Sequence, residues 1–236
     1  MSHGFIMDKG LKFAAFAGDQ SATWHHYGEY NMDGKPLGAW LSASGLDFEA
    51  YKIPAFARLP SGEMVAIPGQ FHIARGDIWG ILSDNTVTER YTLHQTTQLA
   101  EQFQEYISED SRFKWDSMIS IDGGKTIAMS ALFSEDVTAG GDKHQARLLA
   151  TTSFDATAAT VARGHMTRVQ CNNTLRAALG EAGGCVRTRH NTAYNRDRVA
   201  RVLEKIVSSF AAYKAMGDAM AETRMGKDIV SKYFKR

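Results

Sequence analysis

The sequence of 236 residues contains only two cysteines, Cys171 and Cys185, and it has no long apolar run. Two cysteines are too few for a disulfide scaffold and fit a reducing compartment, so we expect free thiols, with a single bridge as the alternative. No window is apolar enough for a membrane span, and residues 1–9 lack the pattern of a signal peptide. These absences predict a cytoplasmic protein with no membrane partner.

Several motifs that carry catalysis are also absent. The chain has no nucleophile elbow, no phosphate-cradling glycine-rich loop, no Cys-x-x-Cys pair and no His-Glu-x-x-His helix. The patch Trp24-His25-His26-Tyr27 has two possible metal ligands, but neighbouring residues of an extended chain point to opposite faces. This favours packing by Trp24 and Tyr27, with the histidines as polar neighbours. We therefore predict neither a cofactor nor a metal site.

What the chain does have is an ordinary globular composition with an uneven charge. Hydrophobic residues make up 44% and charged residues 22%, which is enough for a substantial core. Residues 1–162 hold 12 Lys and Arg against 20 Asp and Glu, whereas residues 163–205 hold 9 against 3, a net charge of +6. A cluster of cations predicts a polyanion-binding face. A solvated basic helix packed on an acidic sheet explains the same charge equally well.

Periodicity and turn residues predict an α+β fold, in which an antiparallel β-meander sheet is covered by helices and followed by a C-terminal helical segment. We divide the chain into an irregular N-terminal arm (1–45), an α+β core (46–190) and a basic helical segment (191–236). Segments 139–142 and 181–189 are predicted loops, the first of them mobile. The predicted strands are 48–58, 64–67, 71–75, 78–82, 86–91, 118–121, 126–133, 145–153 and 158–169. The predicted helices are 37–44 closed by Gly45, one across 96–107, 174–179, one from Asn191 or Thr192 to about 216, and 218–234.

The most informative stretch runs from Thr167 to Leu175, where a strand-like segment leads into a short helix. Val169 and Cys171 suit a buried strand, and Asn172 or Asn173 can cap the helix through its side-chain oxygen. One interpretation is a structural corner. The other is a binding site, because Arg168 and the two asparagines place donors where a helix start attracts anions. Cys171 is predicted to be a buried packing residue.

Two sets of candidate site residues follow. Phosphate contacts are predicted for Arg168, Asn172, Asn173, Arg176, Arg187, Arg189, Arg198 and Arg201, with stacking on bases by Trp24, Tyr27, Trp79 and Tyr91. General acid or base groups are the weaker prediction, with Asp155 and His190 first and His25, Asp77 and His165 as further candidates. Each of these polar residues is also explained as a hydrogen-bonded structural group.

The order of motifs resembles a family of phage and plasmid-like proteins of unknown function. The resemblance rests on Trp24-His25 with Gly28, on Arg75-Gly76-Asp77 with Tyr91 and Gln95, on Ser153-Phe154-Asp155, and on Arg189-His190-Asn191-Thr192. Its most specific part is Arg168 to Leu175, which matches an Arg-Val-x-Cys-x-Asn-Thr-Leu signature. The chain departs from the pattern at Phe154 and Ala156, where the family has His and Gly.

The resemblance implies a setting in a phage or other mobile element rather than a reaction. The order of a β-meander followed by helices is also similar to that of phage single-strand annealing proteins. This similarity implies a protein that binds single-stranded nucleic acid in recombination or replication and forms a homo-oligomer. A phosphate-substrate hydrolase or nuclease and a non-catalytic phage structural or interaction protein are the alternatives. We expect binding more than catalysis.

Overall fold

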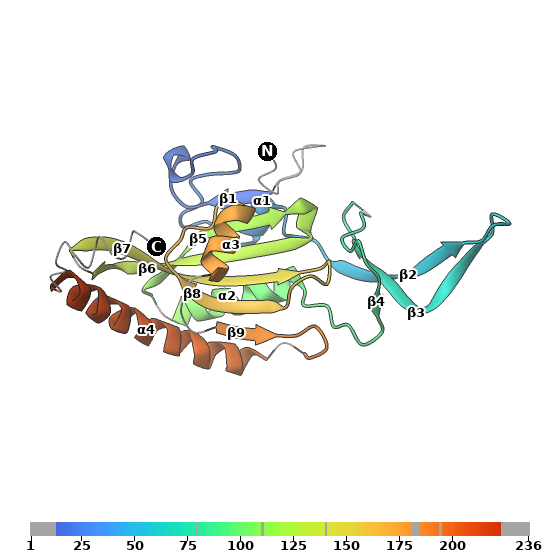
Figure 1. The fold of residues 1–236 in the computed structure, drawn as a ribbon. Coiled ribbons are helices and arrows are strands. Elements are labelled where there is room, and N and C mark those ends of the chain that lie inside the picture. Colours follow the sequence, from blue (N-terminus) through green and yellow to red (C-terminus); the bar gives the residue numbers. More distant parts are fainter. Residues whose placement is uncertain are drawn as a thin grey trace, which may run out of the picture.

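The structure is a computed structural model that describes residues 13–222, apart from positions 79, 110, 140, 181–184 and 194. In this part of the chain the main sheet is antiparallel, with the strand order β1-β5-β6-β7-β8-β9 (Figure 1). Its strands are β1 (Ala14–Phe16), β5 (Phe113–Ile121), β6 (Thr126–Ala139), β7 (Asp142–Ser153), β8 (Thr160–His165) and β9 (Cys185–Thr188). A smaller antiparallel sheet holds β2 (Ala50–Arg58), β3 (Met64–Arg75) and β4 (Val87–Thr88). The helices are α1 (Leu37–Ser44), α2 (Thr96–Glu109), α3 (Asn172–Gly180) and α4 (Arg196–Glu222), which confirms the predicted α+β class.

The centre of the main sheet is the predicted meander, because β5 to β8 follow one another in the chain and are adjacent in the sheet. Asp122, Gly123 and Gly124 connect β5 to β6 with positive φ angles of 50°, 71° and 101°. Tight turns require this conformation, and glycine adopts it without steric penalty. Ala139 pairs with Asp142, so the predicted mobile loop is the tight turn between β6 and β7.

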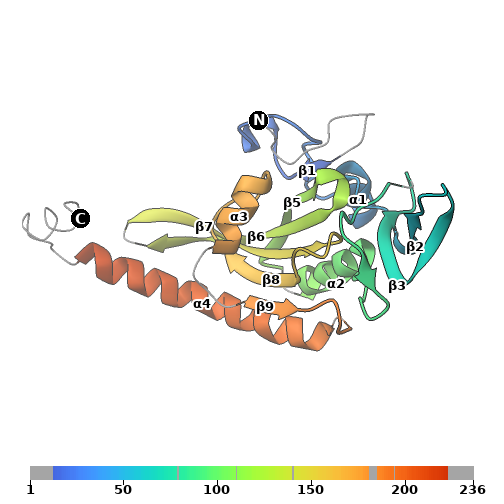
Figure 2. The ribbon, with the colours of Figure 1, turned by 45° about the vertical axis from the view of Figure 1, so that its right-hand side comes forward.

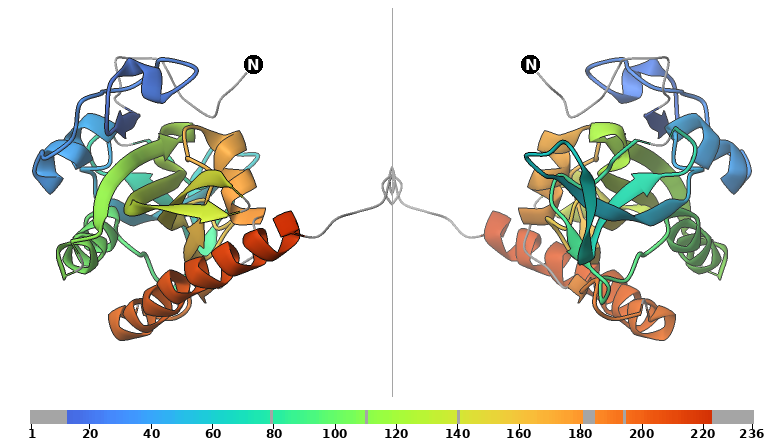
Figure 3. Two further views of the ribbon diagram at one scale, coloured as in Figure 1. Left: turned by 90° about the vertical axis from the view of Figure 1, so that its left-hand side faces the viewer. Right: turned by 90° about the vertical axis from the view of Figure 1, so that its right-hand side faces the viewer.

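The two faces of the main sheet bury different helices. Leu148 and Ala150 of β7 belong to one core cluster, and Leu149 between them belongs to the other, as the two-residue period of a strand requires. α1, α2 and α4 pack on the first face, and α3 packs on the second. Figure 3 shows α2 and α4 on one side of the sheet and α3 on the other.

β2 and β3 form one long hairpin, since their pairing runs from Ala50 with Arg75 to Arg58 with Met64. The two strands predicted at 64–67 and 71–75 are therefore one strand. At its base, the Gln95 side chain donates to the Ala50 carbonyl and accepts from the Ala50 N–H, at 2.9 and 3.0 Å. The far end of the hairpin projects from the body, away from α4 and the β6–β7 turn (Figures 1 and 2).

Local helix and cysteine predictions are confirmed at several places. α1 spans 37–44 and ends at Gly45, which has φ 65°. α2 buries Leu99, Phe103 and Ile107, as its periodicity predicts. Cys171 is buried, and both cysteines are free.

Four local predictions are wrong. Of the strand predicted at 78–82, only Ile81 pairs, in a single bridge with Ala74. The loop predicted at 181–189 contains β9, because Val186 reaches the core and the segment pairs with β8. α4 begins at Arg196 rather than at Asn191 or Thr192, and it continues through 218 to Glu222. Residues 223–236, the rest of the predicted last helix, lie outside the described part of the chain.

The predicted N-terminal arm contributes β1 to the main sheet and α1 to its first face. Among the helices of the described residues, α4 included, none is long and apolar enough to cross a membrane.

α4 packs closely against β8 at Gly164, so a larger residue at this position should destabilise the fold. A Cβ at Gly164 would overlap Cγ2 of Ile206 and lie 3.2 Å from the Phe210 ring. Gly164→Ala should therefore lower the free energy of unfolding by about 1–3 kcal/mol, the usual penalty for overpacking. Urea denaturation measures this, with Gly38→Ala in α1 as the control because a Cβ there meets nothing within 4 Å. An equal or smaller effect at Gly164 than at Gly38 would contradict the prediction.

Candidate functional site

The segment from Arg168 to Leu175 is held together by Thr174. Its Oγ1 accepts hydrogen bonds from the backbone N–H groups of Gln170 and Cys171, at 2.8 and 2.9 Å, and donates to the Cys171 carbonyl at 3.0 Å. α3 then begins at Asn172, so both asparagines lie within its first turn, and Thr174 orders the two residues that lead into the helix. Val169 and Cys171 are buried, as the strand-like pattern predicts.

Arg168 lies beside a buried ion pair. The Asp116 carboxylate, 3% exposed, accepts from Arg147 Nε at 2.9 Å and lies 3.1 Å from Arg168 Nη2. Arg168 also donates to the carbonyl of Ala17 at 2.9 Å, and its guanidinium lies 6.0 Å from the centre of the Phe16 ring. One carboxylate therefore joins β5 to β7 and to the segment after β8.

A cavity of about 580 Å³ opens over these arginines. Among the residues whose side chains the structure describes, its lining is basic and polar, with one apolar side chain and no carboxylate: Lys143, His144, Gln145, Arg147, Met166 and Arg168. Each nitrogen of Arg147 is engaged, because the two that do not bond Asp116 donate to Gln145 and to the Met166 carbonyl at 2.9–3.1 Å. Lys143 is exposed at the mouth. We call this the cation cavity.

The other predicted nucleic-acid contacts lie around the fold, and none lines the cation cavity. Arg176 is exposed on α3, beside Asn173, also exposed, and Asn172, half-buried. Arg187 is exposed on β9, Arg189 follows that strand, and Arg201 is exposed on α4, which packs on the opposite face of the sheet from α3. The side chain of Arg198 and the whole of Trp79 lie outside the described part of the chain. Trp24 and Tyr27 are 60% and 39% exposed.

Sequence reasoning missed Lys143, Arg147 and Asp116. The signal was present, because Arg147 and Asp116 are charged residues within otherwise apolar strand segments. A charge in such a position is almost always paired or bound to something. Which partner it has depends on strand pairing, which the sequence does not show.

His25 contacts the same segment from the N-terminal side. Its Nδ1 accepts from the Tyr27 N–H at 3.0 Å, so Nε2 carries the proton and donates to the Gln170 carbonyl at 3.0 Å. The ring is 7% exposed and stacks on Tyr27 at 5.5 Å. The packing prediction for this patch is therefore wrong in its residues, because His25 is the buried ring and Trp24 and Tyr27 are exposed. In the described residues, no three His, Cys, Asp or Glu side chains come together as metal ligands.

The weaker catalytic candidate His190 belongs to an aromatic stack. Its ring lies between Tyr91, at 4.6 Å and 8°, and His94, at 4.7 Å and 28°. His190 Nδ1 donates to the Thr92 carbonyl at 3.0 Å, and Nε2 lies 3.4 Å from the Thr152 hydroxyl. His94 donates from Nε2 to the Thr192 carbonyl at 3.0 Å and accepts at Nδ1 from the Thr160 hydroxyl at 2.6 Å. Both tautomers are fixed by backbone carbonyls.

The other candidates have structural partners of their own. Asp155 accepts from the hydroxyl groups of Ser153 and Thr157 at 2.7 and 2.6 Å, within a turn. Asp77 forms a bidentate pair with Arg75, which also donates to the Gly123 carbonyl at 2.6 Å. His165 is buried, with Nδ1 2.6 Å from the Thr167 carbonyl.

Burial shifts the pKa of several of these groups. It lowers the pKa of His94, against the hydrogen bond to Thr192, and it lowers the pKa of His190, where His94 acts in the same direction. It raises the pKa of Tyr91, and the Asp155 charge adds to this. Partial burial alone would raise the pKa of Asp77, but its hydrogen bonds and charge pairing with Arg75 hold that pKa below the ordinary value.

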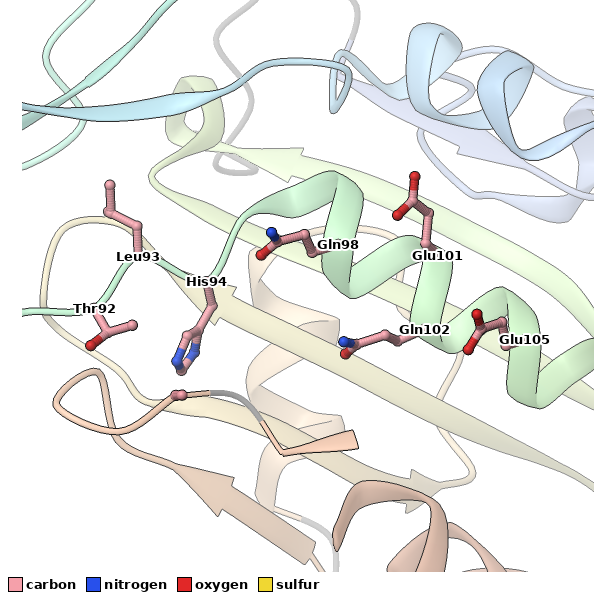
Figure 4. A pocket seen from close by; sticks show the side chains of 8 residues that line it. Thr92, Leu93, His94, Gln98, Glu101, Gln102 and Glu105 are labelled. Atoms are coloured by element: carbon pink, nitrogen blue, oxygen red, sulfur yellow. The ribbon is translucent and has the colours of Figure 1, made fainter. Parts of the chain in front are cut away.

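A second cavity, of about 460 Å³, lies beside His94 (Figure 4). Its lining comes from α2 and from the segments on either side of the stack: Thr92, Leu93, His94, Gln98, Glu101, Gln102, Glu105 and Ala193. Figure 4 shows Gln98 and Gln102 projecting from α2 on the side of His94, whereas Glu101 points the other way. The lining residues that the structure describes include two carboxylates and no Lys or Arg, which disfavours a phosphate group.

Removal of the central carboxylate tests its structural role. Asp116→Asn should lower the free energy of unfolding by about 3–5 kcal/mol, because it leaves two arginines beside a neutral amide in a buried place. Urea denaturation of Asp84→Asn is the control, since Asp84 is 75% exposed and pairs only with Lys125 at the surface; there the loss should stay within about 1 kcal/mol. Similar losses in the two variants would contradict the prediction.

The buried histidine stack predicts a dependence of stability on pH. Unfolded imidazoles take up protons near pH 6.5, while the folded ones, with lowered pKa values, do so only at lower pH. The stack therefore contributes its full stability above pH 6.5 and loses it as the pH falls, by at most about 1.4 kcal/mol per pH unit for each histidine. Urea denaturation between pH 7.5 and 5.5 should show a shallower slope in His94→Gln and in His190→Gln. Slopes equal to that of the wild type would contradict this.

Comparison with known proteins places the chain in a family. Searches of the curated proteins and of the solved structures gave no match. The model of a family described as a domain of unknown function, DUF932, matches residues 85–236, nearly two thirds of the chain. The matched part contains both cavities and the histidine stack, whereas the Trp24-His25 patch and the β2–β3 hairpin precede it. The chain therefore belongs to the DUF932 family of uncharacterised domains.

Proposed function

We propose that this protein binds single-stranded nucleic acid, with the cation cavity as its phosphate-binding centre. The observation that carries the proposal is a cavity of about 580 Å³ whose described lining brings together three cationic side chains, Lys143, Arg147 and Arg168. Guanidinium and ammonium groups are the usual phosphate ligands of proteins. Met166 adds one apolar surface against which a sugar or base can pack.

The cations of the cavity are held in place before any ligand arrives. Arg147 and Arg168 are fixed by Asp116 and by backbone carbonyls. A charge that is already ordered loses little entropy on binding, so it contributes more to affinity than a mobile one. Because every nitrogen of Arg147 already donates to the protein, its main contribution is its charge, and Lys143, whose side chain is exposed, makes the direct phosphate contact.

An extended polyanion also suits the distribution of the remaining cations better than a small phosphate does. Arg176 of α3 and Arg187 of β9 are exposed. Val186 reaches the core cluster of the α4 face, so its neighbour Arg187 points to the other face, as does Arg147, two residues before Leu149 on β7. A single strand passing over this face meets cations beyond the cavity. Its bases stay accessible, which annealing in recombination or replication requires.

The biological setting is part of the proposal and rests on the resemblance to phage and plasmid-like proteins. In that setting a nucleic-acid-binding protein of a phage or other mobile element acts in the host cytoplasm. The alternative of a phosphate-substrate hydrolase has no comparable support, because Asp155 and His190 are engaged with separate structural partners.

Fluorescence anisotropy with a labelled 30-nucleotide strand tests the proposal. We expect the affinity to fall about 20-fold between 50 and 200 mM salt, the dependence of three phosphate contacts on a single strand. Lys143→Gln should weaken binding severalfold and reduce that fall to about 7-fold, because one contact is lost.

The matched control is Lys125→Gln, at the opposite end of the β6–β7 pair from Lys143, where Lys125 pairs with Asp84. Its affinity and salt dependence should equal those of the wild type. An absence of binding at micromolar protein concentration would overturn the proposal, and so would equal losses in the two lysine variants.

A further inference from the structure

The far part of the β2–β3 hairpin exposes apolar side chains on both of its faces. Phe56 pairs with Ala66, and Ala57 pairs with Val65, so Phe56 and Val65 point to opposite faces. Met64 shares the face of Phe56, and Ile67 shares that of Val65. Their exposed fractions are 52% for Phe56, 57% for Met64, 41% for Val65 and 39% for Ile67, with Leu59 at the turn at 42%.

Such a hairpin is not expected to remain uncovered. A two-stranded hairpin alone is at best marginally stable in water. Tyr51, Ile78 and Ile81 extend the exposed apolar surface to its base. At about 200 Å² for a fully exposed large side chain, these three and the five of the hairpin expose on the order of 700 Å². Spread over both faces of one projecting hairpin, this is a large apolar area to leave in contact with water.

The hairpin is built to be covered on its faces rather than extended at its edges. Pro54 in β2 and Pro68 in β3 have no N–H for a further strand, and the pairing is irregular between Pro54 and Phe56. Proline and bulges are the usual protection of edges against strand addition. The partner must therefore bind through side-chain packing.

The charges of the hairpin indicate which partner this is. Between residues 53 and 71 the only charged side chains are Arg58 and Glu63, one on each side of the turn. A neutral apolar surface of this kind does not attract a polyanion. Across a two-fold axis, however, Arg58 of one copy can face Glu63 of the other, and the apolar surface of each copy can cover that of the other.

We propose that the β2–β3 hairpin is the surface through which two copies of this chain associate. Two such surfaces together offer on the order of 1,400 Å², within the roughly 1,200–2,000 Å² that a stable interface buries. The inference does not depend on the proposed nucleic-acid binding, because the cation cavity lies on other elements.

Sedimentation equilibrium of the full chain without nucleic acid tests the inference. The wild type should have twice its monomer mass of 26.0 kDa. The double variant Phe56→Asp/Val65→Asp should sediment as a monomer with an unchanged circular-dichroism spectrum, since it charges both faces. The matched control is Met216→Asp/Met220→Asp on α4, where both methionines are also exposed, at 57% and 64%; it should remain a dimer.

Charge reversal tests the two-fold arrangement itself. Arg58→Glu alone and Glu63→Arg alone should each weaken the dimer about tenfold or more, because like charges then meet across the axis. The double reversal should restore the wild-type affinity. In a shortened chain, the two residues Asn-Gly replace residues 57–65 and connect Phe56 to Ala66. This variant should be a monomer that keeps its fold.

Three results would overturn the inference. One is a wild-type protein that remains monomeric at 100 times the protein concentration used in the fluorescence-anisotropy measurement. Another is a dimer that persists in both the doubly charged and the shortened variants. The third is a double-reversal variant whose dimer is no tighter than that of either single-reversal variant.

Discussion

The arrangement of the basic side of this protein depends on one buried carboxylate. Asp116 lies at the irregularity of β5 between Trp115 and Ser117, where the strand turns its side chain towards β7. There it contacts Arg147 and Arg168, which come from strand β7 and from the segment that leads to α3. Burying a carboxylate carries a large desolvation penalty, which only well-formed ion pairs and hydrogen bonds offset. The ion pairs of Asp116 therefore specify where these segments meet more than they add to stability, and they hold two guanidinium groups in fixed positions.

The polar motifs of the sequence have a common structural explanation. His25 bonds to Gln170, Gln95 to Ala50, and His190 to Thr92, each across at least 45 residues of sequence. A buried polar group must find a partner, and in this fold the partner is usually a backbone group of a distant segment. Residues that look like catalytic candidates in the linear sequence are in several cases the links that hold irregular segments against the sheet.

Local chemistry made part of the fold predictable. Three features depend only on residues close together in the sequence, and the sequence therefore reveals them: the helix end at Gly45, the glycine turn after β5 and the apolar period of α2. β9 could not be predicted, because four residues after Gly183-Gly184 become a strand only when the edge of β8 is available to pair with them. The same limit applies to the site. Arg168 was recognised from its own segment, but Arg147, Asp116 and Lys143 join it only through strand pairing.

The two proposed surfaces lie at opposite ends of the molecule. The β2–β3 hairpin projects at one end, and the β6–β7 turn, near Lys143, lies at the other (Figures 1 and 2). A dimer joined at the hairpins therefore leaves both cation cavities accessible. When one cavity holds a strand, the second meets the same strand at a high effective concentration, so the dimer binds a long strand more tightly than either cavity does. Each cavity can therefore bind nucleic acid weakly, through only a few phosphate contacts, and the dimer still holds an extended strand.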